Sequence, residues 1–180
     1  MRQEGILVKA ATKPQQLKEH TDIIVVDLIT NKEVRIDLKT KKDGQGEFAT
    51  LELLGNYGQA GWLFCSKVNY IAFQPFYNEK KYIIIPRTAL LKMIPHSFWE
   101  WEDNNPRPKL KEVENLSVNT DKRLWKDYTR YRRVDWGHSD LVLKVPFKDI
   151  LKRKESFVFT EDGSPLIIDE VIYNVSTWQW

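Results

Sequence analysis

The stretch that decides the fold of this chain reads TDIIVV at residues 21–26 and, after a short polar turn, VRIDLKTK at residues 34–41. The run from Ile23 to Leu28 is apolar and rich in β-branched side chains, which is typical of a buried strand. From Glu33 to Thr40, apolar and charged side chains alternate, so one face of a second strand is apolar and the other is charged. The turn at residues 30–32 joins the two strands, and the sequence therefore predicts an antiparallel hairpin.

Outside this hairpin the pattern continues as a mixture of strands and short helices. A charged, glycine-containing turn from Lys41 to Gly46 leads to the apolar run Phe48 to Leu54, which we expect to add a third strand and complete an antiparallel meander. Upstream, the segment from Ala10 to His20 predicts a loop and a short helix with Thr12 as its N-terminal cap. Two more strands and a helix are expected at Val68 to Phe73, Lys81 to Ile85 and Thr88 to Ile94.

The composition changes after residue 95. From His96 to Leu116 the sequence has two prolines and no apolar period, which predicts a long loop. The expected fold class is α/β, with a central mixed β-sheet flanked by helices over residues 1–95 and a β-rich C-terminal extension over residues 96–180. In the extension we expect short strands and one helical turn, at Leu141 to Val145, Lys148 to Lys152, Phe157 to Thr160 and within Leu166 to Val175.

The composition also limits the classes of protein to which the chain can belong. With 180 residues, of which 42% are apolar, it can bury a core as a single domain. No apolar run approaches the roughly 18 residues of a membrane span, and residues 1–11 lack the layout of a secretory signal. Cys65 is the only cysteine, which excludes an intramolecular disulfide, and the three histidines show no ligand spacing. We therefore expect a soluble, cytoplasmic protein.

Two carboxylates and one lysine are the candidates for chemistry. Asp22 precedes the first strand, while Asp37 and Lys39 share the charged face of the second, so the hairpin can bring them to one end of the sheet. Two carboxylates this close repel each other unless a cation lies between them or one is protonated. Hard oxygen ligands suit Mg²⁺ or Mn²⁺, and Lys39 can then steady the charge on a phosphoryl group. The alternative is a solvated strand face with an ordinary ion pair, worth at most about 1 kcal/mol.

These residues carry a resemblance to a known family. TDIIVV followed by VRIDLKTK resembles the PD-(D/E)XK nuclease superfamily, with Asp22 as the first acid and Asp37-Leu38-Lys39 as the (D/E)-x-K motif. The downstream GQAGWLF, VNYIAF and YIIIP segments are similar to phage-type members, and the resemblance covers Ala10 to Ile94. It implies a restriction-endonuclease-like core, which Holliday-junction resolvases share, and a Mg²⁺-dependent activity in which Mn²⁺ substitutes.

The resemblance also implies roles for single residues. Asp22, Asp37 and the backbone carbonyl of Leu38 would be the metal ligands, and Lys39 would be the catalytic lysine. Three further polar residues are candidates, the first as an additional acid and the other two as phosphate contacts: Glu52, Gln59 and Lys67. His20 and Cys65 receive no role, because an exposed loop histidine and a core thiol are the more common interpretations of such residues.

A second candidate for DNA contact lies in the C-terminal half. Between residues 122 and 133, six basic side chains are interleaved with three aromatic ones and a single acid. Basic side chains pair with phosphates while Trp or Tyr stacks on bases, and the net charge of +3 is compatible with DNA without indicating it. The alternative is an amphipathic surface strand or helix whose Leu124, Trp125 and Tyr128 pack inward. The basic residues are Lys122, Arg123, Lys126, Arg130, Arg132 and Arg133.

Together these features predict a metal-dependent endonuclease that hydrolyses DNA phosphodiester bonds, with branched or recombination DNA as the candidate substrate by analogy with relatives. Because many relatives cut as dimers, we expect a homodimer, located in the host cytoplasm if the chain is phage-encoded. The sequence has no Walker-type glycine loop, so no nucleotide cofactor is expected.

Two other functions stay open. One is a catalytically inactive nuclease-fold module that binds DNA or a protein partner, and the short segment before Asp22 favours it. The superfamily usually carries a glutamate on a helix in that position, where this chain has only Glu4 and Glu19 as acids. The other makes the aromatic and acidic segment from Phe98 to Trp101 an anchor for a partner protein.

Overall fold

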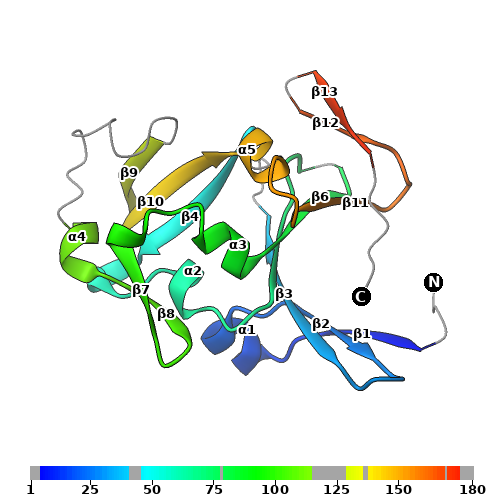
Figure 1. Ribbon diagram of the computed structural model, residues 1–180, viewed down its shortest axis with the longest axis horizontal. Helices are drawn as coiled ribbons and strands as arrows, with labels where there is room; N and C mark the ends of the chain where they lie inside the picture. The colour runs from blue at the N-terminus through cyan, green and yellow to red at the C-terminus, as the bar shows by residue number, and fades with distance from the viewer. Residues whose placement is uncertain are drawn as a thin grey trace.

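The computed structural model describes residues 5–40, 46–77, 79–114, 129–135, 138–168 and 170–174, which form a mixed α/β fold with short helices (Figure 1). The strands are β1 (Ile6–Ala10), β2 (Ile23–Asp27), β3 (Glu33–Lys39), β4 (Phe48–Leu54), β5 (Tyr70–Phe73), β6 (Lys81–Pro86), β7 (Trp99–Glu102), β8 (Asn105–Pro108), β9 (Thr129–Asp135), β10 (His138–Pro146), β11 (Phe157–Thr160), β12 (Leu166–Ile168) and β13 (Val171–Tyr173). The helices are α1 (Lys13–Glu19), α2 (Trp62–Cys65), α3 (Arg87–Leu91), α4 (Leu110–Glu114) and α5 (Phe147–Leu151), with 3₁₀ turns η1 (Asn56–Gly58) and η2 (His96–Phe98).

The larger sheet contains six strands in the order β1-β2-β3-β5-β6-β11. The predicted hairpin of β2 and β3 is confirmed, with Ile23 opposite Ile36. β3 and β5 are parallel, and the other neighbouring strands are antiparallel, so the sheet is mixed as expected. Parallel pairing sets Asp37 of β3 beside Ile71 of β5, and paired residues share one face of a sheet. The charged face of β3 therefore points the same way as Ile71.

The predicted antiparallel meander is wrong at its third strand. β4 leaves the larger sheet and joins a second one in the order β4-β10-β9, with Leu51 opposite Leu143. In a meander, the third strand would pair with the second edge of β3. That edge already pairs with β5, in parallel. Because Leu51 and Leu53 are fully buried, β4 contributes to the core from the second sheet instead.

The main core lies on the face of the larger sheet to which Ile71 belongs. It joins Ile71 and Phe73 to β4, to α2 and to β10, and its aromatic members include Phe147, whose ring centroid lies 5.8 Å from that of Phe73. The opposite face has a smaller cluster that includes Val25, Val34 and Ile36. Residues on both sides of position 95 share the main core, and the division into 1–95 and 96–180 stays a prediction.

The long loop predicted from His96 to Leu116 is also wrong. This stretch contains η2, the hairpin of β7 and β8, and α4. The hairpin turns through Asp103 and Asn104, which have φ angles of 47° and 63°, as a tight two-residue turn requires. Trp99 anchors the hairpin, because it is buried and its Nε1–H donates to the Ile94 carbonyl at 2.9 Å.

Most other local predictions agree with the structure. Thr12 precedes α1 as its cap, and its hydroxyl and N–H both donate to Gln15 Oε1 at 2.9 Å. β11 has the predicted bounds, and β12 and β13 form the hairpin that projects at upper right in Figure 1.

Of the basic segment, residues 122–128 lie outside the described residues, whereas 129–133 belong to β9. Within the described part of the chain, no helix has the length and apolarity that crossing a membrane requires.

Gly61 generates the first prediction, because the backbone of β4 passes directly against it. A Cβ at this position would overlap the Glu52 carbonyl and lie 2.8 Å from the Leu53 carbonyl carbon. We expect Gly61→Ala to lower the free energy of unfolding by about 3 kcal/mol, the upper end of overpacking costs. Gly55→Ala is the control, since its Cβ meets only the far end of the Glu52 side chain at 3.1 Å and should cost less than about 1 kcal/mol. Urea denaturation measures both, and equal losses would contradict the interpretation.

Candidate functional site

Asp22 is held against β3 by its backbone and by its side chain. Its N–H donates to the Ile36 carbonyl at 2.9 Å, which extends the pairing of β2 with β3 by one residue. Its carboxylate Oδ2 then accepts the N–H of Leu38 at 2.8 Å. The hairpin therefore brings Asp22 beside the Asp37-Leu38-Lys39 motif, as the sequence predicted.

Asp37 is enclosed, with only 2% of its surface exposed. Its Oδ2 forms an ion pair with Lys39 Nζ at 2.8 Å. The sequence left open that this strand face is solvated. That alternative is wrong for Asp37, because its side chain lies on the same face as its partner Ile71, toward the main core. A carboxylate in this position keeps its charge only if a cation stays close to it.

The two carboxylates influence each other. The pKa of Asp37 is raised to about 6, chiefly by burial, and the nearby Asp22 adds to the rise, whereas Lys39 opposes it. These opposing effects are the expected signature of paired acids next to a single lysine. A pKa strongly perturbed by burial and by defined charged neighbours is also a frequent mark of a functional site.

Lys39 is held from a second side by an aromatic ring that sequence reasoning did not assign to the site. Its Nζ lies 4.2 Å from the ring centroid of Trp62, the first residue of α2, in a cation–π contact. The signal in the sequence is the Gly-Trp pair, which entered the sequence analysis only as part of the resemblance. Because Trp62 is buried, it fixes the height of the ammonium above the sheet.

His20 and Cys65 also meet at this site. Cys65 Sγ lies 3.4 Å from His20 Nε2, and His20 has a left-handed backbone with φ of 53°. Burial lowers the pKa of His20, and the charge of Lys39 lowers it further. The prediction of a core thiol is wrong, since Cys65 is exposed. The spacing of these two residues along the chain gives no signal of their contact.

The outlying candidates from the sequence occupy different surroundings. Glu52 belongs to β4 in the second sheet. Partial burial of the Cys65 sulfur is the main cause that raises the pKa of this thiol, and the charge of Glu52 raises it further. Gln59 is exposed in the loop before α2. Lys67 is 67% exposed, and its Nζ lies 3.6 Å from a carboxylate oxygen of Glu19. The roles predicted for these three residues stay predictions.

A hard divalent cation fits part of this arrangement. Leu38 faces Asp22 with its N–H, and because the N–H and C=O of a strand residue point to the same side, its carbonyl is directed to that side too. Two carboxylates and one carbonyl suit Mg²⁺, which commonly keeps several waters. Among the described residues, no group of three or more His, Cys, Asp and Glu side chains is arranged to hold a metal ion. A cation held by Asp22, Asp37 and the Leu38 carbonyl would have few protein ligands, which suits Mg²⁺ better than Zn²⁺.

In comparisons with known proteins, no protein-family model, no curated protein and no solved structure matches the chain.

The raised pKa of Asp37 predicts a pH dependence of stability. The folded protein holds this proton up to about pH 6, whereas the unfolded chain releases it near 3.8, so the free energy of unfolding should fall as pH rises between these values. The amide that Asp37→Asn introduces has no such proton to lose. Relative to wild type, this variant should therefore gain about 1–3 kcal/mol between pH 4 and pH 7.

Urea denaturation across this pH range, in a buffer containing EDTA, measures the difference between the two proteins. Curves that stay parallel from pH 4 to pH 7 would show that Asp37 is not enclosed as described.

Proposed function

We propose that this protein is a metal-dependent endonuclease that hydrolyses DNA phosphodiester bonds. The observation that carries the proposal is the enclosed Asp37, which lies between Lys39 on its own strand and Asp22 at the head of the neighbouring one. The resemblance of the same three residues to the PD-(D/E)XK motif supports it independently of the geometry.

Each residue then has a defined task. Asp22, Asp37 and the Leu38 carbonyl would hold Mg²⁺, which supplies charge neutralisation at the phosphate and a more acidic bound water. Lys39 would place its ammonium beside the non-bridging oxygens of the scissile phosphate. Trp62 limits how far that ammonium can move, since the cation–π contact keeps it near 4.2 Å from the ring.

DNA would be gripped by the basic segment between residues 122 and 133, part of which belongs to β9. β9 is the neighbour of β10 in the second sheet, and the first strand of that sheet, β4, contacts α2. Through β10 and β4, the β9 part of the segment is thus connected to α2, whose Trp62 contacts Lys39, and this supports DNA contact near the site. Since each site acts on one strand, a homodimer would be needed for a double-strand cut.

A second function is favoured by one specific observation. Lys39 neutralises Asp37 directly, at 2.8 Å, so the acid already has a cation without any metal. In an inactive nuclease-fold module, this ion pair would be permanent, and the protein would bind DNA or a partner without cleaving it. The two functions differ in whether a divalent cation displaces Lys39.

The decisive test is cleavage of linear duplex, single-stranded, flap and four-way-junction DNA with Mg²⁺ or Mn²⁺. We expect wild type to cleave at least one of these DNAs, and Asp37→Asn and Lys39→Ala to lose at least about 100-fold in rate, because the first removes a proposed metal ligand and the second a cation beside the phosphate. EDTA should abolish the reaction. Arg107→Ala is a matched control, since Arg107 pairs with Glu102 on the exposed hairpin, and it should cleave like wild type. DNA binding without cleavage by wild type would instead support the inactive module.

The basic segment predicts a salt dependence. Replacing Lys122, Arg123 and Lys126 by Ala should weaken DNA binding equally for all sequences and flatten the slope of log K against log salt by up to about 0.9 per lost phosphate contact. Fluorescence anisotropy at several salt concentrations measures the slope. Replacing three lysines elsewhere, Lys13, Lys18 and Lys92, keeps the net charge change equal and should leave the slope unchanged. An identical slope in both triple variants would exclude the segment as a DNA contact.

A further inference from the structure

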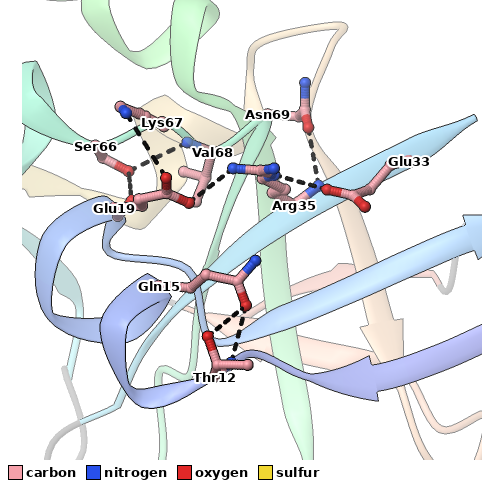
Figure 2. A network of polar contacts seen from close by, with 9 residues as sticks. All are labelled: Thr12, Gln15, Glu19, Glu33, Arg35, Ser66, Lys67, Val68 and Asn69. Carbon is pink, nitrogen blue, oxygen red and sulfur yellow. Dashed lines mark hydrogen bonds and ion pairs between the residues drawn. The ribbon is translucent and has the colours of Figure 1, made fainter.

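A second network of polar contacts joins residues of α1, β3 and the segment after α2 (Figure 2). Its centre is the ion pair of Glu19 and Arg35, in which Glu19 Oε2 lies 2.7 Å from Arg35 Nη1. The guanidinium also meets Glu33, whose Oε1 is 2.7 Å from Arg35 Nε. The side chains of Glu19 and Arg35 are only 24% and 31% exposed, so solvent screens this pair less than an ordinary surface pair.

The backbone around the two residues is tied down as well. The carbonyl of Glu19 accepts the N–H of Lys67 at 3.1 Å and the hydroxyl of Ser66 at 3.4 Å. Asn69 pairs with Arg35 in both directions: its Oδ1 accepts the Arg35 N–H at 2.8 Å, and its own N–H donates to the Arg35 carbonyl at 2.9 Å. The end of α1, the strand β3 and the segment after α2 are thus joined at one place.

Each part of this network adjoins a residue of the site. Glu19 comes directly before His20 and three positions before Asp22. Arg35 lies two positions before Asp37 on β3, so the two side chains share one face of the strand. Ser66 directly follows Cys65. The network therefore fixes the three backbone segments that deliver the site's side chains.

The chain between α1 and β2 has a particular need for such support. His20 ends α1 in the left-handed conformation, which is strained for a residue with a side chain and persists only where the surroundings enforce it. The Glu19 side chain is the anchor on one side of His20, and the Asp22 hydrogen bonds to β3 are the anchor on the other. Without the first anchor, this connection can relax and carry Asp22 away from Leu38.

We propose that Glu19 is a positioning residue: its ion pair with Arg35 holds the α1–β2 connection so that the Asp22 carboxylate stands ready beside Asp37 for a divalent cation. The proposal rests on the proposed function for its metal. Glu19 does not touch the cation in this role, because both of its oxygens face basic side chains, Oε2 toward Arg35 and Oε1 toward Lys67.

The test compares Glu19→Gln with Glu33→Gln. Both substitutions remove one carboxylate from the same guanidinium, but Glu33 lies two residues from Arg35 on the same strand, so its ion pair joins no second element to β3. Glu19→Gln should raise the Mn²⁺ concentration for half-maximal DNA cleavage about tenfold and leave kcat at saturating Mn²⁺ within about twofold of wild type. Glu33→Gln should change neither quantity more than about twofold. A loss of kcat at saturating metal, or equal effects of the two variants, would overturn the proposal.

A second measurement does not depend on activity. Hydrogen exchange of the Leu38 amide, followed by NMR, reports directly whether Asp22 Oδ2 still accepts it. In metal-free buffer Glu19→Gln should accelerate this exchange about tenfold relative to wild type, and Glu33→Gln should not. If wild type neither cleaves DNA nor binds Mn²⁺, the proposed function fails, while the exchange rate still decides whether Glu19 positions Asp22. Equal Leu38 exchange in all three proteins overturns the positioning role whatever the activity.

Discussion

The parallel pairing of β3 with β5 determines where most other elements lie. It occupies the edge that β4 would take in a simple meander, so β4 is displaced into the second sheet and the core forms between the two. It also turns the charged face of β3 inward, with Asp37 beside Ile71. An unsupported carboxylate there would cost several kcal/mol. Lys39 offsets this cost, because its ammonium lies 2.8 Å from Asp37 and also contacts the ring of Trp62. Asp37 is thus a buried acid with a defined cation beside it.

This arrangement links stability and function at one carboxylate. Asp37 is held in a setting that favours its protonated form, which makes it a weak point of the fold above about pH 6 in the absence of other cations. In the proposed nuclease, a divalent cation bound at Asp37 would remove this penalty. Natural proteins commonly accept local strain of this kind where chemistry requires it. His20, with its left-handed backbone beside Asp22, is a second instance within the same few residues.

Local patterns predicted much of the fold, and contacts between distant segments account for what was missed. The alternation in β3, the apolar run of β2 and the cap at Thr12 are readable because each depends on neighbours within a few residues. The partner of β4 is β10, far along the chain, and no local pattern reveals it. The prolines that suggested a loop after His96 are tolerated in β8, since it pairs on only one side. The grouping of Asp22, Asp37 and Lys39 was predictable, whereas the enclosure of Asp37, the Trp62 contact and the meeting of His20 with Cys65 depend on how α2 packs.

The order of strands in the two sheets has a consequence for how the chain reaches this structure. The outer strands of the larger sheet are β1 and β11, from the beginning and the late part of the chain, and Leu51 of β4 finds its partner only at Leu143. Pairings this distant must overcome the entropy of closing long loops, which slows folding. During synthesis the backbone edge of β4 therefore stays without its partner strand until β10 has been made. Until β10 emerges from the ribosome, that exposed strand is a site where chaperones can bind and where aggregation can begin.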